Sequence, residues 1–124
     1  MKRFIEHDGH ERYGLTAAAI AGELVFTGTM AMDLETLRRA PDAHTIADET
    51  RLCVASIERT LAEAGCGLAD LVKVNCYLAD DADRAEFWEA YDALVPAGAV
   101  RLTQVAGIAG DCRVQLEVVA VRPS

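Results

Sequence analysis

The stretch that most constrains the fold is residues 99–121, AVRLTQVAGIAGDCRVQLEVVAV, because polar and apolar side chains alternate along it at the period of a β-strand. Turn-forming residues at Gly107–Asp111 separate its two halves, so the sequence predicts a hairpin of two paired strands. In the second strand, alternate residues are apolar and face one side of the sheet, whereas Gln115 and Glu117 face the other. Arg101 in the first strand and Glu117 in the second then form either a structural ion pair or the charged end of a ligand site.

The length and charge of the chain exclude several classes of protein. At 124 residues the chain is expected to form one domain over residues 1–124. Its net charge of −8 disfavours nucleic-acid binding, which depends largely on lysine and arginine. The N-terminal segment MKRFIEHDGH is charged, and no run of about 18 apolar residues occurs, so neither a secretory signal nor a membrane span is expected. We therefore expect a cytoplasmic protein.

The cysteine and histidine content favours a protein without metal. None of the four cysteines belongs to a C-x-x-C pair, so they are expected to be small buried thiols in a reducing compartment. Cys66, between two glycines, is expected to be the most exposed. His7, Asp8 and His10 lack a third strong ligand nearby, so we expect no metal and no other cofactor.

The N-terminal third of the chain reads as strands. Residues 1–14 are polar and are expected to contain a short edge strand. The alanine-rich run 15–20 and residues 24–30 follow as two strands joined by a tight turn. Gly28, inside the second of them, indicates a β-bulge or the close approach of another backbone. Over residues 33–44 the alternation fails, which predicts a loop.

The strongest predicted helix begins after Thr45. Asp48, three residues later, completes a capping-box pattern, and Gly65 ends the helix. Apolar residues recur between them at spacings of three and four, which predicts one buried stripe. The residues expected on that stripe are Ile46, Thr50, Val54, Ile57, Leu61 and Ala64.

A strand and a second helix follow. Residues 71–78 alternate, and the side chains predicted to face the core are Val72, Val74, Cys76 and Leu78. The second helix is expected to be capped by Asp83 and Glu86 and to end before Pro96. Its expected buried stripe comprises Phe87, Tyr91 and Leu94.

The order ββ-α-β-α-ββ indicates an α/β (α+β) protein, a two-layer sandwich with both helices on one face of a mixed sheet. The opposite face mixes polar side chains with Tyr77, Val119 and Val121, which makes it too apolar for a solvated surface. We therefore expect the chain to oligomerise through this uncovered face.

Several segments in this order resemble the RidA (YjgF-type) reactive-intermediate deaminase family over nearly the whole chain. The matching segments are AGELVFTG, TIADETRLCVASIERTLAEAGCGLADLVKVNCYLADD, FWEAYDAL and GDCRVQLEVVAV. The resemblance implies a chorismate-mutase-like fold and a homotrimer with small-molecule pockets at its subunit interfaces. It also implies an imine/enamine deaminase, which hydrolyses intermediates such as 2-aminoacrylate to a 2-oxo acid and ammonia without metal or cofactor.

The resemblance also implies a set of site residues. In the family an arginine holds the substrate carboxylate and a carboxylate on the last strand positions water. An ungapped match of the last segment puts Val100 at the arginine position and Gln115 at the carboxylate position, with Arg101 and Glu117 nearby. The candidate catalytic residues are therefore Arg101, Gln115 and Glu117. The candidate substrate-binding residues are Leu15 at the family's tyrosine position, Gly28 at its serine position, Thr29, Trp88 and Val100.

The direction of Arg101 decides between two functions. In the ungapped register Arg101 points with Thr103 toward the helices, whereas a β-bulge near Gly98 or Val100 turns it into the pocket. Gln115 can hold a water molecule but cannot accept its proton. An arginine in the pocket favours the deaminase, and an arginine at the helices favours a trimer that binds a small ligand without turning it over. An RNA-cleaving role fits the acidic composition least well.

Overall fold

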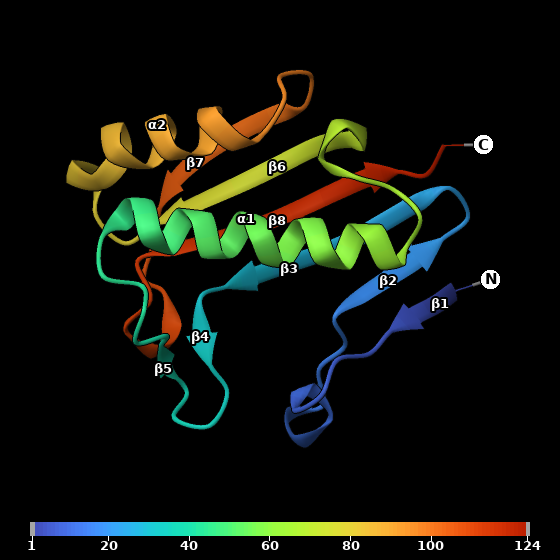
Figure 1. Cartoon of the computed structure of the whole chain (residues 1–124), viewed down its shortest axis with the longest axis horizontal. Helices are drawn as coiled ribbons and strands as arrows, with labels where there is room; N and C mark the ends of the chain where they lie inside the picture. Colours follow the sequence, from blue (N-terminus) through green and yellow to red (C-terminus); the bar gives the residue numbers. More distant parts are fainter. Residues whose placement is uncertain (1, 124) are drawn as a thin grey trace.

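The computed structural model describes residues 2–123, which form a six-stranded sheet with two α-helices against one face (Figure 1). The strand order is β1-β2-β3-β8-β6-β7, and all neighbours are antiparallel except β6 and β7. The strands are β1 Lys2–Ile5, β2 Ala18–Ala21, β3 Leu24–Met30, β6 Leu71–Leu78, β7 Val100–Val105 and β8 Val114–Val121. The helices are α1 Ile46–Glu63 and α2 Arg84–Leu94.

Shorter elements connect these parts. A two-stranded ribbon, β4 Met32–Asp33 and β5 Arg38–Arg39, occupies the region predicted to be a loop. The 3-10 turns are η1 His10–Tyr13, η2 Leu68–Asp70, η3 Asp81–Asp83 and η4 Ala109–Asp111. Among residues 2–123, no helix is long and apolar enough to cross a membrane. The two-layer fold and the mixed sheet predicted from the sequence are therefore confirmed, and β1 is the short edge strand expected within residues 1–14.

The predicted hairpin of residues 99–121 is wrong, although both of its strands exist. β7 pairs in parallel with β6, and β8 inserts between β3 and β6, so the two strands are not neighbours. The helix α2 carries the chain from β6 to β7, and a helical crossover joins parallel strands. η4, where Gly110 and Asp111 have φ of 68° and 63°, then turns the chain back to the centre of the sheet.

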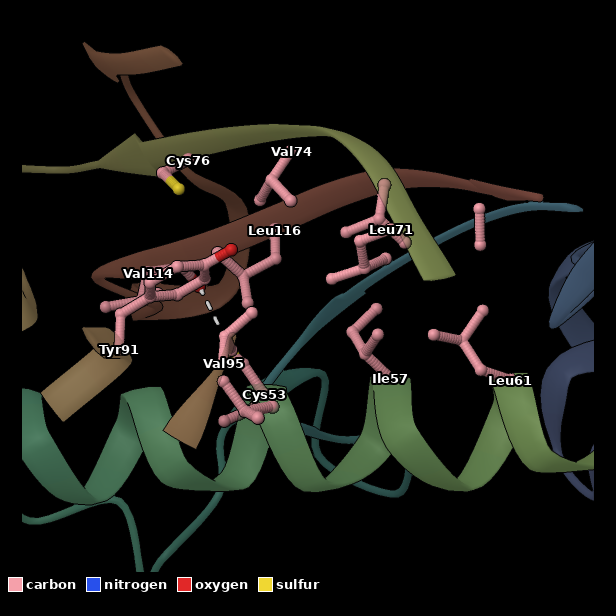
Figure 2. Close-up of a cluster of buried hydrophobic side chains, with 14 of the residues drawn as sticks. Cys53, Ile57, Leu61, Leu71, Val74, Cys76, Tyr91, Val95, Val114 and Leu116 are labelled. Atoms are coloured by element: carbon pink, nitrogen blue, oxygen red, sulfur yellow. Dashed lines mark hydrogen bonds between the residues drawn. The ribbon is translucent and has the colours of Figure 1, made fainter. Parts of the chain in front are cut away.

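The helix α1 forms as predicted. Thr45 Oγ1 accepts a hydrogen bond from Asp48 N at 3.0 Å, and Asp48 Oδ2 accepts one from Thr45 N at 3.2 Å, which completes the capping box. Beyond its C-terminal end, Gly65 adopts a φ of 83°. The whole predicted stripe is buried, and Figure 2 shows its members Ile57 and Leu61 pointing at the sheet.

Two predicted core residues are instead exposed. A register shift between Leu71 and Lys73 interrupts the pairing of β6 with β8, so Leu71 is buried and Val72 is 41% exposed. In α2, Leu94 is also 41% exposed, because it lies in the last turn. Glu86 does not cap its own helix: its carboxylate accepts a hydrogen bond from Ala47 N of α1 at 2.9 Å.

The sheet face away from the helices mixes exposed apolar side chains with polar ones, as predicted. Val25 is fully buried under α1, so its neighbours Leu24 and Phe26 point to the opposite face, where they are 39% and 42% exposed. Along β7, Val100 and Leu102 pair in register with Lys73 and Asn75 and lie on the same uncovered face.

Candidate ligand-binding site

Gly28 lies close against the backbone of the neighbouring strand β8. It is paired with Glu117 of β8, and a Cβ atom at this position would lie 3.0 Å from the carbonyl oxygen of Leu116. Of the two alternatives predicted for Gly28, a bulge or a close backbone approach, the structure has the second. The missing side chain leaves room on the surface around this residue.

A shallow pocket of about 420 Å³ opens beside Gly28 on the uncovered sheet face. Gln115 and Glu117 line it from β8, while Phe4 and Phe26 supply apolar walls. Three of the predicted site residues, Gly28, Gln115 and Glu117, are therefore brought together.

Glu117 is held in place by its neighbour on β6. Its Oε1 accepts a hydrogen bond from Asn75 Nδ2 at 3.1 Å. Asn75 Oδ1 is buried and has no hydrogen-bond partner among residues 2–123. The carboxylate is exposed and positioned at the pocket, whereas Gln115 presents an amide, which does not accept a proton from water near neutral pH.

Arg101 lies on the other face of the sheet, against α2. Its Nη1 pairs with Asp92 Oδ1 at 2.5 Å, and its guanidinium lies 5.2 Å from the ring centre of Tyr91 and 5.8 Å from that of Trp88. β7 pairs with β6 without a shift from Val100 to Val105, so no bulge turns the side chain. Arg101 and Glu117 are separated by β6 and point to opposite faces, so they form neither the structural ion pair nor the charged end of one ligand site, the two alternatives predicted from the sequence.

Arg101 belongs to a cluster of polar and aromatic side chains on the helix side, which borders a pocket of about 570 Å³ between the end of α2 and β7. Trp88 Nε1 donates a hydrogen bond to Thr103 Oγ1 at 3.1 Å, which fixes the indole over β7. Burial raises the pKa of Tyr91 to about 12, and the nearby Cys76 thiol adds to the effect. Trp88 contacts Thr103 and the Arg101 guanidinium, so it is grouped with Arg101 and not with Gly28.

The remaining predicted site residues lie apart. Val100 is 63% exposed on the uncovered face, but two strands away from β8. Leu15 and Thr29 line a second pocket of about 430 Å³ on the helix side of Gly28, and Thr29 Oγ1 hydrogen-bonds with Ser56 Oγ at 3.2 Å. Gly28 thus lies between two pockets, one on each face of the sheet.

Sequence reasoning missed the most buried ionic contact of the chain. Glu49 is fully buried, and its carboxylate accepts hydrogen bonds from Arg113 Nε at 2.8 Å, Arg113 N at 2.6 Å and Val114 N at 2.9 Å. The helix period carried a signal, because Glu49 falls between Ile46 and Cys53 on the buried stripe. The pair fixes the start of β8 against the first turn of α1.

The cysteines are free thiols and lie as predicted. Cys53, Cys76 and Cys112 are buried and Cys66 is partly exposed. Burial raises the pKa of Cys53 and of Cys76 to about 12, so neither is a thiolate near neutral pH. Within residues 2–123, no group of three or more His, Cys, Asp or Glu side chains is placed to hold a metal ion.

The sequence as a whole matches the family model described as endoribonuclease L-PSP over residues 9–122. The chain belongs to this family, which includes the YjgF and RidA proteins. A YjgF family protein from Neisseria meningitidis is 27% identical, with a TM-score of 0.83 over 100% of this chain and 97% of the other. RidA from an Antarctic Psychrobacter is 24% identical, with a TM-score of 0.76 over 87% of this chain and 88% of that one, which shows the shared fold.

A fission yeast relative matches over a shorter stretch. The mitochondrial protein Mmf1 of Schizosaccharomyces pombe is 40% identical over 52 residues, which are 42% of this chain and 32% of Mmf1. The match therefore spans about a third of that relative. These similarities establish the YjgF/RidA family and its fold for this chain.

Proposed function

We propose that this chain is a single-domain RidA-type protein that forms a homotrimer. It binds a small organic molecule in the pocket beside Gly28 on the uncovered sheet face, here called the open-face pocket, without the usual deaminase chemistry. The observation that carries the proposal is the direction of Arg101. Its guanidinium is held by Asp92, Trp88 and Tyr91 on the helix side, and the pocket that contains Gln115 and Glu117 lies on the opposite face.

The lining of the open-face pocket supports binding over catalysis. An imine of a 2-oxo acid carries a carboxylate, which needs a positioned cation, yet no lysine, arginine or histidine is among the described residues that line this pocket. Its walls are largely apolar, with Phe4 and Phe26 at the rim. A neutral or weakly polar ligand suits such a surface better than an anion.

The alternative is an imine deaminase in which Glu117 serves as the base. Its carboxylate is exposed at the pocket and oriented by Asn75, and this contact favours the alternative enough to test it. The two proposals differ in one measurable quantity, the rate at which ammonia is released from an imine.

We expect the wild-type protein to leave the rate of ammonia release from 2-iminopropanoate, generated in situ, at the buffer value. The double variant Val100→Arg with Gln115→Glu restores a cation on the open face and a proton acceptor on β8, and we expect it to accelerate release at least tenfold. Arg101→Ala is the control and leaves both rates unchanged. Acceleration by the wild type contradicts the binding proposal and supports the deaminase, whether or not Arg101→Ala abolishes it.

We also propose a cytoplasmic location, because the four cysteines are free thiols, as is usual in a reducing compartment. The fission yeast relative Mmf1 is described as mitochondrial, so the two compartments are the alternatives. Fractionation of cells that express the chain with a C-terminal tag distinguishes them, and recovery of the tag in an organelle contradicts the proposal.

A further inference from the structure

The pocket on the helix side of Gly28 has the features of a separate binding site made within one chain. It encloses about 430 Å³ between the N-terminal turn η1, the strand β3 and the helix α1. One part of its wall is apolar and is formed by Leu15, Met30, Met32 and Leu34. Another part carries the hydroxyl groups of Ser56 and Thr60 together with His10 and Arg59. An apolar wall with a few polar groups is typical of sites for small organic ligands.

Two polar groups of this pocket lack partners. His10 Nδ1 is buried and makes no hydrogen bond to any of residues 2–123. A buried ring nitrogen without a partner costs free energy, so its presence beside a cavity indicates a group that a ligand completes. Arg59, likewise, forms no ion pair within the described residues.

The reason that Arg59 is unpaired is visible in α1. Glu63, four residues further along the helix, is at the usual spacing for an ion pair with Arg59. Its Oε2 is instead 2.9 Å from His7 Nε2. Glu63 does not itself line the pocket; Asp8 is the acidic residue among the described lining residues, and it is exposed. The contact with His7 therefore leaves the guanidinium of Arg59 available to an anion.

The wall formed by the N-terminal segment is fastened at three points. Besides the contact of His7 with Glu63, the hydroxyl of Tyr13 donates to the carbonyl oxygen of Leu34 at 2.9 Å, and Arg12 pairs with Glu35 at 3.2 Å. In Figure 1 this segment lies below α1, on the same side as the β4–β5 ribbon. A wall held in this way is formed before the ligand arrives, which lowers the entropy lost on binding.

We propose that this pocket binds a small carboxylic acid with an apolar tail. The carboxylate pairs with the guanidinium of Arg59 and accepts a hydrogen bond from His10 Nδ1–H, and the tail lies against Met30, Met32 and Leu34. The proposal requires neither the trimer nor the open-face pocket, because every group that it uses comes from one chain.

Isothermal titration calorimetry with hexanoate tests the proposal. We expect hexanoate to bind the wild-type protein and Arg59→Gln to weaken it at least tenfold, since a charge-assisted pair is lost. Arg59→Lys retains the charge and is expected to lose less affinity. Arg38→Gln is the matched control, because Arg38 is also exposed and without an ion pair among residues 2–123, and we expect it to bind as the wild type does.

Two further measurements separate this site from the open face. Hexanoate is expected to shift the ¹⁵N resonance of His10 Nδ1, and Phe26→Glu, which alters the open-face pocket, is expected to leave hexanoate affinity unchanged. Thermal unfolding verifies that each variant is folded. The proposal is overturned if the wild type does not bind hexanoate at concentrations up to about 10 mM, which is on the order of the dissociation constant of the weakest specific sites. Equal affinity of the wild type and Arg59→Gln for hexanoate also overturns it.

Discussion

At the residue scale, the contact between Glu49 and Arg113 shows how one buried carboxylate joins two elements. The Glu49 carboxylate accepts the hydrogen bonds that two backbone N–H groups at the start of β8 would otherwise make to water. Its negative charge also neutralises the guanidinium of Arg113. Arg113 Nη2 donates to the carbonyl oxygen of Ala43 at 3.0 Å, so the loop before α1 is fastened by the same side chain. A buried pair of this kind is costly to break from one side, because the remaining charge stays buried.

We expect Glu49→Gln to lower the free energy of unfolding by about 3 kcal/mol. The amide is neutral, and its NH₂ group is a donor that faces the N–H donors of Arg113 and Val114 and so finds no acceptor. Urea unfolding monitored by circular dichroism measures the change. Glu58→Gln, at an exposed position of the same helix, is the control and is expected to change stability by less than about 0.5 kcal/mol. Equal stability of the two variants contradicts the structural role of Glu49.

The buried thiols make the free energy of unfolding depend on pH in the alkaline range. Burial raises the pKa of Cys53 and Cys76 to about 12, from an ordinary value near 9. Between these values the unfolded chain loses its thiol protons and the folded chain keeps them, so the folded state is favoured below pH 9 and loses stability as the pH rises toward 12.

We expect the free energy of unfolding in urea to fall from pH 9 to pH 11, each buried thiol contributing up to about 1.4 kcal/mol per pH unit. Cys53→Ala is expected to lower the free energy of unfolding at every pH. It is also expected to make the fall of this free energy with pH less steep, by the contribution of one buried thiol. All other ionisable groups are common to the two proteins, so the difference in slope isolates the thiol. An unchanged slope in Cys53→Ala is the result that contradicts the prediction.

At the scale of elements, the ribbon β4–β5 is fastened to the turn η4. A Cβ atom at Gly110 would lie 2.4 Å from Met32 Cε and 2.6 Å from the carbonyl oxygen of Leu37, so the two segments are in close contact. In addition, Arg39 Nη1 donates a hydrogen bond to the carbonyl oxygen of Asp111 at 3.3 Å. The ribbon is therefore positioned by the segment that leads into β8.

We expect Gly110→Ala to destabilise the protein by about 3 kcal/mol, of which about 1 kcal/mol reflects the left-handed backbone and the rest the contact with the ribbon. Gly14→Ala isolates the backbone cost, because Gly14 has the same φ of 68° and nothing within 4 Å of the added atom. The difference between the two variants in urea unfolding measures the contact, and a difference near zero contradicts it.

The same scale shows what the sequence could predict. The helix α1 was predictable in full, because its caps and its stripe are encoded within 20 consecutive residues. The pairing of the strands could not be predicted, because the alternation of polar and apolar residues identifies a strand but does not show which strands lie beside it. The turn between β7 and β8 indicated a hairpin, but the crossover through α2 had already placed β7 beside β6.

The candidate site follows the same division. Gly28 and Glu117 meet because β3 and β8 pair directly, and alternation correctly placed Gln115 and Glu117 on one face. Arg101 was placed on the helix side by its register, but its partner Asp92 lies on another element and carries no sequence signal. Val72 was assigned to the wrong face, because a bulge shifts alternation by one residue without a marker in composition.

At the scale of the whole molecule, the uncovered face of the sheet explains why we propose a trimer. Phe4, Leu24, Phe26, Val100 and Leu102 are each between 39% and 63% exposed on it. So many large apolar side chains on one sheet face are typical of an interface between copies. In the proposed trimer, covering this face also encloses the open-face pocket, so we expect assembly and ligand binding to be coupled.

We expect light scattering at micromolar concentration to give a mass of about three times 13.3 kDa for the wild type. Phe26→Glu buries a charge in the proposed interface and is expected to give monomers. Leu94→Glu, which changes an equally exposed leucine in α2, is expected to remain trimeric. A wild-type monomer under these conditions contradicts the trimer.

The central position of β8 has a consequence for the order in which the protein can be made. Before residues 114–121 leave the ribosome, β1, β2 and β3 form one half of the sheet and β6 and β7 the other, and no main-chain ladder joins them. α1 has no completed surface to cover during that time, and Glu49 has no cation from Arg113. The fold therefore cannot close until β8 has emerged, and until then the edges of β3 and β6 that β8 will occupy stay open and invite chaperones or misassembly.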